Sequence, residues 1–372
     1  MNRRIAFYAP LKAPDHPTPS GDRRMARLLI QALEAAGAEV AVASDFRSYD
    51  GQGDPTRQLS LRATGTALAD RLIAQYQAQR PQDRPTAWFT YHLYHKAPDW
   101  LGAKVSAALA IPYLVAEASF APKRAGGPWD LGHQAAARAI SAANWLYCLT
   151  RLDMACVTPL VPDGHELVFL PPFLDAAAIL AGRRDRAMLA ARHGLDPERR
   201  WLLCVAMMRP GDKLQSYQRL GAALDRLGRN DWQLLVVGDG AARDGVEAAL
   251  APIADKLALL GAAAPSALPE IYRACDIYVW PGVGEAYGMA YIEAQAAGLP
   301  VVAGHERGVP DVVRNGETGL LTAPGDDDAF SAAVARLLDD DQLRGRLASA
   351  ARDFITRERT VASAAAVLGA AL

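Results

Sequence analysis

The chain has 372 residues, a length that favours two domains over one. Its 40 basic and 41 acidic residues leave a formal net charge of −1, which argues against a broad nucleic-acid-binding surface. No stretch supplies the ~18 uninterrupted apolar residues of a membrane-spanning helix, and the first residues lack the apolar run of a signal peptide. We therefore expect a cytoplasmic protein, with peripheral membrane contact left open.

Short apolar strands alternate with longer amphipathic helices over the first half of the chain. The first strand is followed by a helix predicted over residues 22–36, which Gly37 ends. This alternation is typical of a mostly parallel α/β sheet. The predicted strands cover residues 4–10, 39–44, 87–91, 112–117, 144–150 and 166–171.

The stretch "FLPPFLD", residues 169–175, interrupts this pattern with two prolines that suit a turn. The alternation then restarts, with strands predicted at 201–208, 232–240, 256–261, 276–280 and 300–304. We predict two Rossmann-like, doubly wound domains over residues 1–172 and 173–355. The apolar helix predicted within 356–372 packs on one of them; the first domain is the candidate, and the choice stays open.

Neither half carries a dinucleotide-binding fingerprint. After the strand at 232–240, Gly238 and Gly240 are present, but Arg243 stands where a third glycine would permit close helix–strand packing. No GxxxxGK[ST] loop occurs, and the four cysteines form no CxxC pair or Cys/His cluster. We expect no cofactor and no bound metal.

Two glutamates, Glu285 and Glu293, lie eight positions apart in the otherwise small or apolar segment 282–304. A buried carboxylate is costly without a partner. The start of a helix predicted over 289–297 offers unpaired N–H groups to an anion, and each carboxylate can accept hydrogen bonds from hydroxyls. A nucleotide sugar has this layout, with hydroxyls on both sides of a diphosphate. In a continuous helix the two glutamates would lie ~12 Å apart along the axis. This separation argues against the carboxylate pair of a glycoside hydrolase.

Residues 268–326 resemble the donor-binding half of glycosyltransferase family 4. They carry its E-x7-E motif, the continuation "EAxAxGxPVV" and the turn "NGxTGxL", and the upstream "MMRPGDK" and "VVGDG" extend the likeness over most of 200–340. The resemblance implies the GT-B fold, two Rossmann-like domains with the active site in the cleft between them. It also implies retention of the anomeric configuration and no essential metal.

By that resemblance, Glu293 binds the donor ribose and Glu285 the transferred sugar. The backbone N–H groups of Tyr287, Gly288 and Met289 then face the diphosphate. For Glu293 the alternative is a structural carboxylate paired with a neighbouring cation, and for the other three it is ordinary helix initiation.

Arg209 and Lys213 follow the strand at 201–208 and would neutralise the departing nucleoside diphosphate. The chain departs here from the family pattern "GRLxxEKG", with Ala206 in place of the glycine and Leu214 after the lysine. A solvated surface cation is therefore the alternative, above all for Arg209.

In the first domain, "PTPSGDRRMARLL" resembles the family's glycine-rich loop. Gly21 would let the backbone approach the donor phosphates, with Arg24 nearby. Because only one glycine is present, a plain loop with Asp22 as the helix N-cap is the alternative.

The segment "TYHLYHKAPDWLG" resembles the part of the family that reaches into the cleft. It contains His92 and His95, and which of them faces the cleft stays open. Glu117 stands near a strand end where relatives often carry a histidine, and here the chain departs from the family pattern.

The loop "APKRAGGPWD", residues 121–130, combines Lys123 and Arg124 with Trp129. It could meet an anionic or sugar acceptor, and a solvated loop is the alternative.

These patterns predict a glycosyltransferase, most simply a hexosyltransferase, that moves a sugar from a nucleoside-diphosphate donor to a hydroxyl acceptor. The acceptor class (glycan, lipid-linked or small molecule) stays open. Two alternatives are a non-catalytic sugar-nucleotide-binding protein and a GT-B sugar-nucleotide epimerase.

Overall fold

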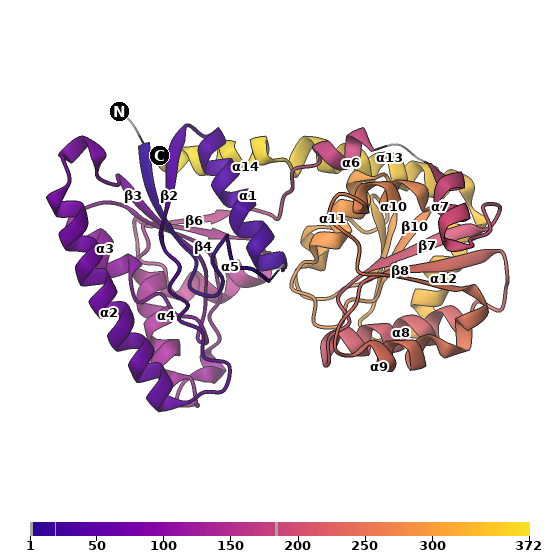
Figure 1. Cartoon of the computed structure of the whole chain (residues 1–372), viewed down its shortest axis with the longest axis horizontal. Helices are drawn as coiled ribbons and strands as arrows, with labels where there is room; N and C mark the ends of the chain where they lie inside the picture. The colour runs from indigo at the N-terminus through magenta and orange to yellow at the C-terminus, as the bar shows by residue number, and fades with distance from the viewer. Residues whose placement is uncertain (1–2, 19, 183–184) are drawn as a thin grey trace. The chain divides into compact units, whose positions relative to one another are not determined.

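The computed structural model describes residues 3–18, 20–182 and 185–372. Its contacts divide the chain into two units, shown in Figure 1: the first runs to Pro171 and includes Val361–Leu372, and the second is Pro172–Thr360. The second unit extends beyond the predicted boundary at residue 355, because helix α13 (Asp341–Glu358) continues past it. The chain therefore passes between the units twice.

The first unit is built on a six-stranded parallel sheet of order β2-β1-β3-β4-β5-β6. In Figure 1, α2 and α3 lie on one side of this sheet and α1 on the other, where it packs against α14. The sheet is buried between these layers, and Trp88 and Tyr113 are fully enclosed in its core. The strands are β1 (Arg3–Tyr8), β2 (Ala38–Ser44), β3 (Ala87–Leu93), β4 (Tyr113–Ala118), β5 (Trp145–Cys148) and β6 (Glu166–Phe169); the helices are α1 (Gly21–Ala35), α2 (Pro55–Ala78), α3 (Gly102–Leu109), α4 (Asp130–Ala142), α5 (Arg151–Val157) and α14 (Val361–Leu368).

The start of α1 corrects one sequence prediction. The helix begins at Gly21, and the N-cap is Ser20, whose side chain accepts a hydrogen bond from the Arg23 N–H. Asp22 therefore lies inside the first turn, where its carboxylate is available to another partner. The helix ends as predicted before Gly37, which adopts a φ of +89° that favours glycine.

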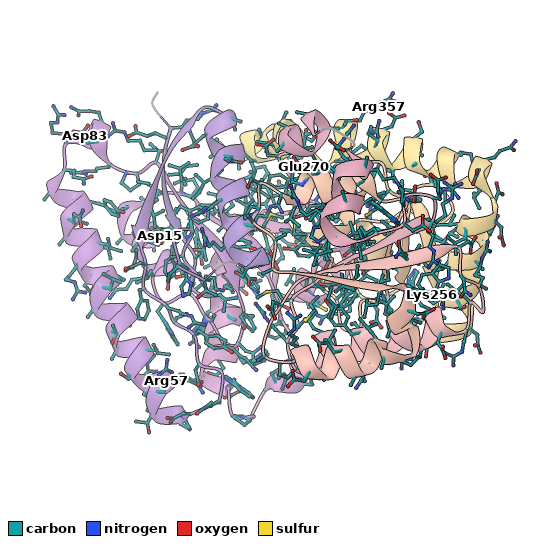
Figure 2. All side chains as sticks on the ribbon, turned by 45° about the vertical axis from the view of Figure 1, so that its right-hand side comes forward. Asp15, Arg57, Asp83, Lys256, Glu270 and Arg357 are labelled. Atoms are coloured by element: carbon teal, nitrogen blue, oxygen red, sulfur yellow. The ribbon has the colours of Figure 1, made fainter. Side chains whose placement is uncertain are left out.

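Helix α2 is the longest in the described chain, with 24 residues. Figure 2 shows Arg57 near its first turn and Asp83 beyond its last, at opposite ends of the unit. Among the described residues, no helix combines the length and apolar composition needed to cross a membrane.

The second unit carries a parallel sheet of order β12-β11-β10-β7-β8-β9, the strand order of a doubly wound Rossmann fold. Figure 1 shows α8 and α9 on one side of it and α10 and α11 on the other. The edge strand β12 (Gly319–Thr322) lies in the "NGxTGxL" stretch, where only a turn was predicted. The other strands are β7 (Arg200–Val205), β8 (Trp232–Val237), β9 (Leu257–Gly261), β10 (Ile277–Trp280) and β11 (Val301–Gly304); the helices are α6 (Ala177–Ala181), α7 (Arg186–His193), α8 (Asp212–Asp225), α9 (Arg243–Leu250), α10 (Leu268–Ala274), α11 (Met289–Ala296), α12 (Asp327–Asp339) and α13.

Gly238 and Gly240 allow the loop after β8 to pack closely against the loop after β7. A Cβ on Gly238 would lie 1.9 Å from the Ala206 carbonyl oxygen, and one on Gly240 would lie 2.3 Å from that of Met208. The Met208 N–H donates to the Asp239 carbonyl at 3.0 Å. The two glycines therefore serve close packing between loops, which explains their presence without a dinucleotide fingerprint.

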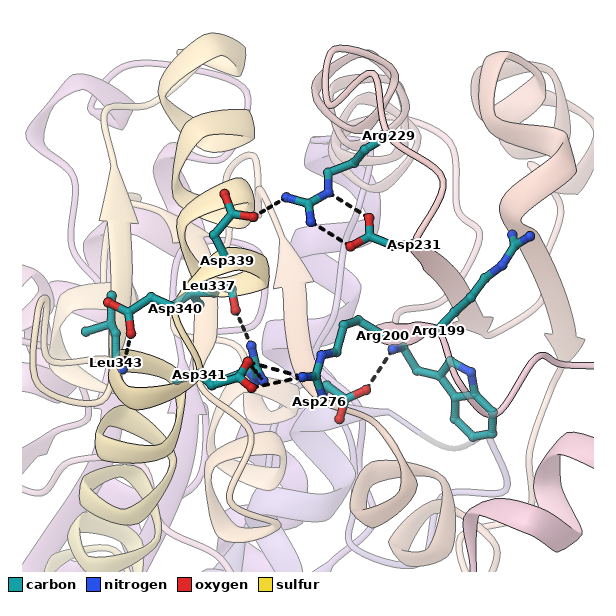
Figure 3. A network of polar contacts seen from close by, with 12 residues as sticks. Arg199, Arg200, Arg229, Asp231, Asp276, Leu337, Asp339, Asp340, Asp341 and Leu343 are labelled. Carbon is teal, nitrogen blue, oxygen red and sulfur yellow. Dashed lines mark hydrogen bonds and ion pairs between the residues drawn. The ribbon is translucent and has the colours of Figure 1, made fainter.

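Exposed ion pairs join the segment before β8 to helix α12, and the start of β7 to helix α13; we call them the ionic network (Figure 3). Arg229 pairs with both Asp231 and Asp339, and Arg200 pairs with Asp341 at 3.1 Å. Asp341 is the first residue of α13 and pairs with the first residue of β7, at the opposite end of that strand from the loop that leads to Lys213 in α8. We therefore assign this network a structural role.

Candidate functional site

The loops after β7 and β10 meet at the point where the strand order of the second sheet reverses. These strands are adjacent in the sheet but distant in sequence, and open α/β sheets bind ligands at such a point. Lys213, in the first turn of α8, brings its Nζ to 2.5 Å from Glu285 Oε2. The Trp280 Nε1–H donates to the same oxygen at 3.3 Å, and Lys213 Nζ lies 5.4 Å from the centre of that ring. With 32% and 16% of the lysine and glutamate side chains exposed, the pair remains accessible to a ligand.

The loop from Pro281 to Gly288 has its shape imposed by glycines. Gly282, Gly284 and Gly288 adopt φ values of +69°, +63° and +76°. A Cβ on Gly288 would lie 2.5 Å from the Tyr291 ring, and one on Gly282 would lie 2.3 Å from the Tyr291 hydroxyl, which donates to the Trp280 carbonyl at 3.1 Å. The loop is thus held close to the helix that it precedes.

This loop delivers the chain into α11, whose N-cap is Gly288. Among the described residues, the backbone N–H groups of Gly288 and Met289 donate no hydrogen bond. Tyr287, the third residue predicted here, is buried with 8% of its surface exposed. Two free N–H groups at a helix start form a site suited to an anion.

Glu293 lies about one turn inside α11 and is 5% exposed. Its Oε2 accepts a hydrogen bond of 2.8 Å from the Tyr272 hydroxyl on α10. Sequence reasoning did not identify this tyrosine; its place in the segment that resembles the family, "LPEIYRAC", was the only available signal. One partner of the buried carboxylate is therefore a hydroxyl.

Arg209 lies in the loop after β7 but is exposed to solvent. Its Nη2 lies 2.9 Å from Met207 Sδ, and in the described chain it forms no ion pair with a carboxylate. The structure thus joins Lys213, and not Arg209, to Glu285.

The first sheet reverses its strand order between β1 and β3, and a second polar cluster lies at that edge. His92 Nδ1 lies 3.1 Å from Asp22 Oδ1 and 3.7 Å from Glu117 Oε1. His92, near the end of β3, and Glu117, near the end of β4, adopt φ values of +61° and +56°, which are uncommon for residues other than glycine. Asp153 also contributes to the acidic surroundings of His92, and its carboxylate accepts a hydrogen bond of 2.7 Å from the Thr150 hydroxyl. Asp22 and Asp153 were not predicted as cleft residues.

The protonation of this cluster follows from its carboxylates. Burial alone would lower the pKa of His92, but Glu117 and Asp22 outweigh it and raise that pKa to about 9. Burial raises the pKa of Glu117 to about 7 despite the nearby imidazolium. Burial also opposes ionisation of Asp22, but the hydrogen bond and charge of His92 lower its pKa overall. At neutral pH the cluster therefore holds the His92 imidazolium beside the Asp22 carboxylate, with Glu117 about half protonated.

Three other predicted residues have different surroundings. Gly21 opens α1, and a Cβ there would meet no atom within 4 Å, so the neighbouring packing does not demand glycine. Arg24 is half-buried in the same turn. His95 packs edge-on against Tyr94 and Trp129 rather than joining the carboxylates around His92. Which histidine meets a substrate stays a prediction.

No arrangement of three or more His, Cys, Asp and Glu side chains suited to a metal ion occurs within the described residues.

Comparison with known proteins finds a family match within the second unit. Residues 199–340 match the family model described as "Glycosyl transferases group 1". The chain is 35% identical over 199 residues to a D-inositol 3-phosphate glycosyltransferase of Rhodococcus jostii, covering 51% of this chain and 43% of that protein. It is 30% identical over 204 residues to a GDP-mannose-dependent α-(1-6)-phosphatidylinositol monomannoside mannosyltransferase of Mycobacterium tuberculosis, covering 52% of each. These matches span about half the length of each relative.

The whole chain shares its fold with solved glycosyltransferase structures. Sucrose-phosphate synthase from Thermosynechococcus elongatus superimposes with a TM-score of 0.75 at 19% identity, covering 99% of this chain and 98% of that one. The predicted GT-B fold is thus confirmed for the chain, and the predicted family resemblance is confirmed over residues 199–340, which match the group 1 glycosyltransferases.

Proposed function

We propose that the chain transfers a sugar from a nucleoside-diphosphate donor to a hydroxyl acceptor, with retention of configuration and without a metal or cofactor. The observation that carries this proposal is the contact of Lys213 with Glu285 beside the free N–H groups of Gly288 and Met289. A cation, a carboxylate and helix-start amides at one switch point suit a diphosphate joined to a polyhydroxylated sugar.

In this proposal Lys213 neutralises the charge that develops on the departing diphosphate. An ammonium group has three donors, so Lys213 can keep Glu285 as one partner and hold a phosphate oxygen with another. Glu285 then accepts from the hydroxyls of the transferred sugar, and Glu293 accepts from the ribose. Arg209 is exposed in the same loop and would add a second cation to the phosphate.

The first unit contributes the acceptor side in this proposal. In this proposal Gly21 and Arg24 are assigned to the donor phosphates, and His92 with Glu117 to sugar hydroxyls, as the family resemblance implies. We also propose a cytoplasmic location for the protein, with peripheral contact with a membrane.

Thermal unfolding in the presence of UDP-, GDP- and ADP-sugars tests donor binding. A ligand at 100 times its Kd stabilises the native state by about 2.7 kcal/mol. The matching donor should raise the Tm of the wild-type chain and leave that of Lys213→Gln close to its ligand-free value. If no sugar nucleotide raises the Tm, the proposal fails.

Turnover then separates the three functions considered. The selected donor is incubated with hydroxyl acceptors, beginning with D-inositol 3-phosphate because the Rhodococcus jostii relative is named for it. A glycosylated acceptor supports transfer, and NMR of its anomeric proton reports the configuration. Binding without product across the panel favours a non-catalytic protein, and isomerised donor without acceptor favours an epimerase.

A further inference from the structure

A cationic surface on the first unit is not used by the donor chemistry. Lys96 and Arg124 belong to different loops, yet both lie against the ring of Trp129. Lys96 Nζ is 4.6 Å from the ring centroid, and Arg124 Cζ is 6.0 Å from it. We call these three residues the Trp129 cluster.

The loops that carry the cluster are joined by hydrogen bonds. The Asp50 N–H donates to the Lys96 carbonyl at 2.8 Å, and the Trp129 Nε1–H donates to the Asp50 carbonyl at 2.9 Å. The amide of Gln58, on α2, donates to the Pro128 carbonyl at 2.8 Å. Hydrogen bonds between separate segments thus hold Lys96 and Trp129 in place.

Neither Lys96 nor Arg124 forms an ion pair within the described chain. The nearby Asp130 accepts from the Gly126 N–H at 2.7 Å and from the Gln134 amide at 2.6 Å. The pKa of the neighbouring His95 is lowered to about 4, first by burial and then by the positive charges of Arg124 and Lys96.

The cluster is connected to the second polar cluster by a row of aromatic rings. His92 lies 5.3 Å from Tyr94, Tyr94 lies 5.2 Å from His95, and His95 lies 5.8 Å from Trp129, measured between ring centroids. His92 and Lys96 follow the same strand, β3. A molecule along this row would meet carboxylates and the His92 imidazolium at one end and two cations with an indole face at the other.

We infer that the Trp129 cluster binds a phosphate monoester carried by the acceptor. Two cations balance a dianion, and the arginine fork can bind two phosphate oxygens. This inference rests on the proposed function, because it names the acceptor of the same reaction. The phosphate could belong to a soluble sugar or polyol, or to a lipid headgroup, and the chemistry at the cluster would be the same.

Equilibrium binding to the full chain tests the inference, with glucose 6-phosphate as the probe and glucose as the uncharged match. Lys96→Gln and Arg124→Gln should each weaken glucose 6-phosphate binding by roughly one to two orders of magnitude, because each removes a charged hydrogen bond to the phosphate. Arg71→Gln is the control: it removes the same charge from an exposed position on α2 and should leave binding unchanged. Vesicles of phosphatidic acid in phosphatidylcholine replace the soluble probe in a second arm.

The inference is supported if either phosphate-bearing probe binds, and if that binding is weakened in the two cluster variants and kept in Arg71→Gln. Soluble binding assigns the phosphate to a small molecule, and binding to vesicles alone assigns it to a lipid. It is overturned if neither probe binds wild type, if the cluster variants bind like wild type, or if Arg71→Gln loses as much affinity. Donor binding is measured in parallel: its loss in Lys213→Gln with phosphate binding retained separates this site from the proposed donor site.

Discussion

Replacing Glu293 tests the donor site most directly, and its tyrosine partner decides which substitution to use. Glu293→Ala would leave the buried Tyr272 hydroxyl without this acceptor, at a cost of about 1–3 kcal/mol that would be confused with a binding defect. Glu293→Gln keeps an oxygen that can accept from Tyr272 and removes the charge alone. It is therefore the sharper perturbation.

The expected loss is that of a charged hydrogen bond to the donor. A contribution of about 1.5–3 kcal/mol corresponds to nucleotide binding weakened by roughly one to two orders of magnitude. Because the tyrosine contact is retained, the free energy of unfolding should change by no more than about 1 kcal/mol, a Tm shift of about 2–4 °C for a unit of this size. Isothermal titration of the matching nucleotide and thermal unfolding measure the two quantities.

Tyr272→Phe is the matched control, because it removes the hydroxyl and leaves the carboxylate. If the Glu293 carboxylate binds the donor, Tyr272→Phe should lower the Tm. It should reduce nucleotide affinity less than Glu293→Gln does. If Glu293→Gln binds the nucleotide as tightly as wild type while remaining folded, Glu293 is a structural residue and the donor-site reasoning is wrong.

Three further predictions address charge, packing and protonation. Lys213→Met should lower kcat by about 10²–10³-fold in a donor-turnover assay, and an unchanged kcat would exclude this lysine from leaving-group stabilisation. Gly238→Ala should destabilise the second unit by at least about 3 kcal/mol in urea unfolding, because its Cβ would lie 1.9 Å from a carbonyl oxygen. The control Gly228→Ala, at φ +59° in open space, should cost only about 1–2 kcal/mol. Equal losses in the two variants would contradict the packing argument. The pKa of His92 is raised from 6.5 to about 9, so its stabilising contribution is complete below pH 6.5 and is lost as the pH rises to about 9. Unfolding measured across that range should show a decline in stability that His92→Gln reduces, and identical slopes would refute the ion-pair assignment.

The amino-acid sequence by itself determined the α/β class, the two-unit organisation and the loop that carries Glu285. These features are local, because strand and helix periodicities are written into consecutive residues and the donor motif is one continuous segment. The glycines between residues 282 and 288 also predicted a loop that needs unusual backbone angles. The short edge strand β12 was missed, since four residues beside a glycine turn carry little periodicity of their own.

Only the tertiary structure decided which side chains meet. The contact between Lys213 and Glu285 depends on β7 lying beside β10, and the contact of Asp22 with His92 depends on β1 lying beside β3. The hydrogen bond from Tyr272 to Glu293 similarly joins two helices, and the two cations on Trp129 come from separate loops. Sheet order and loop packing arise from non-local burial, so residues far apart in sequence become partners only when the sheets assemble.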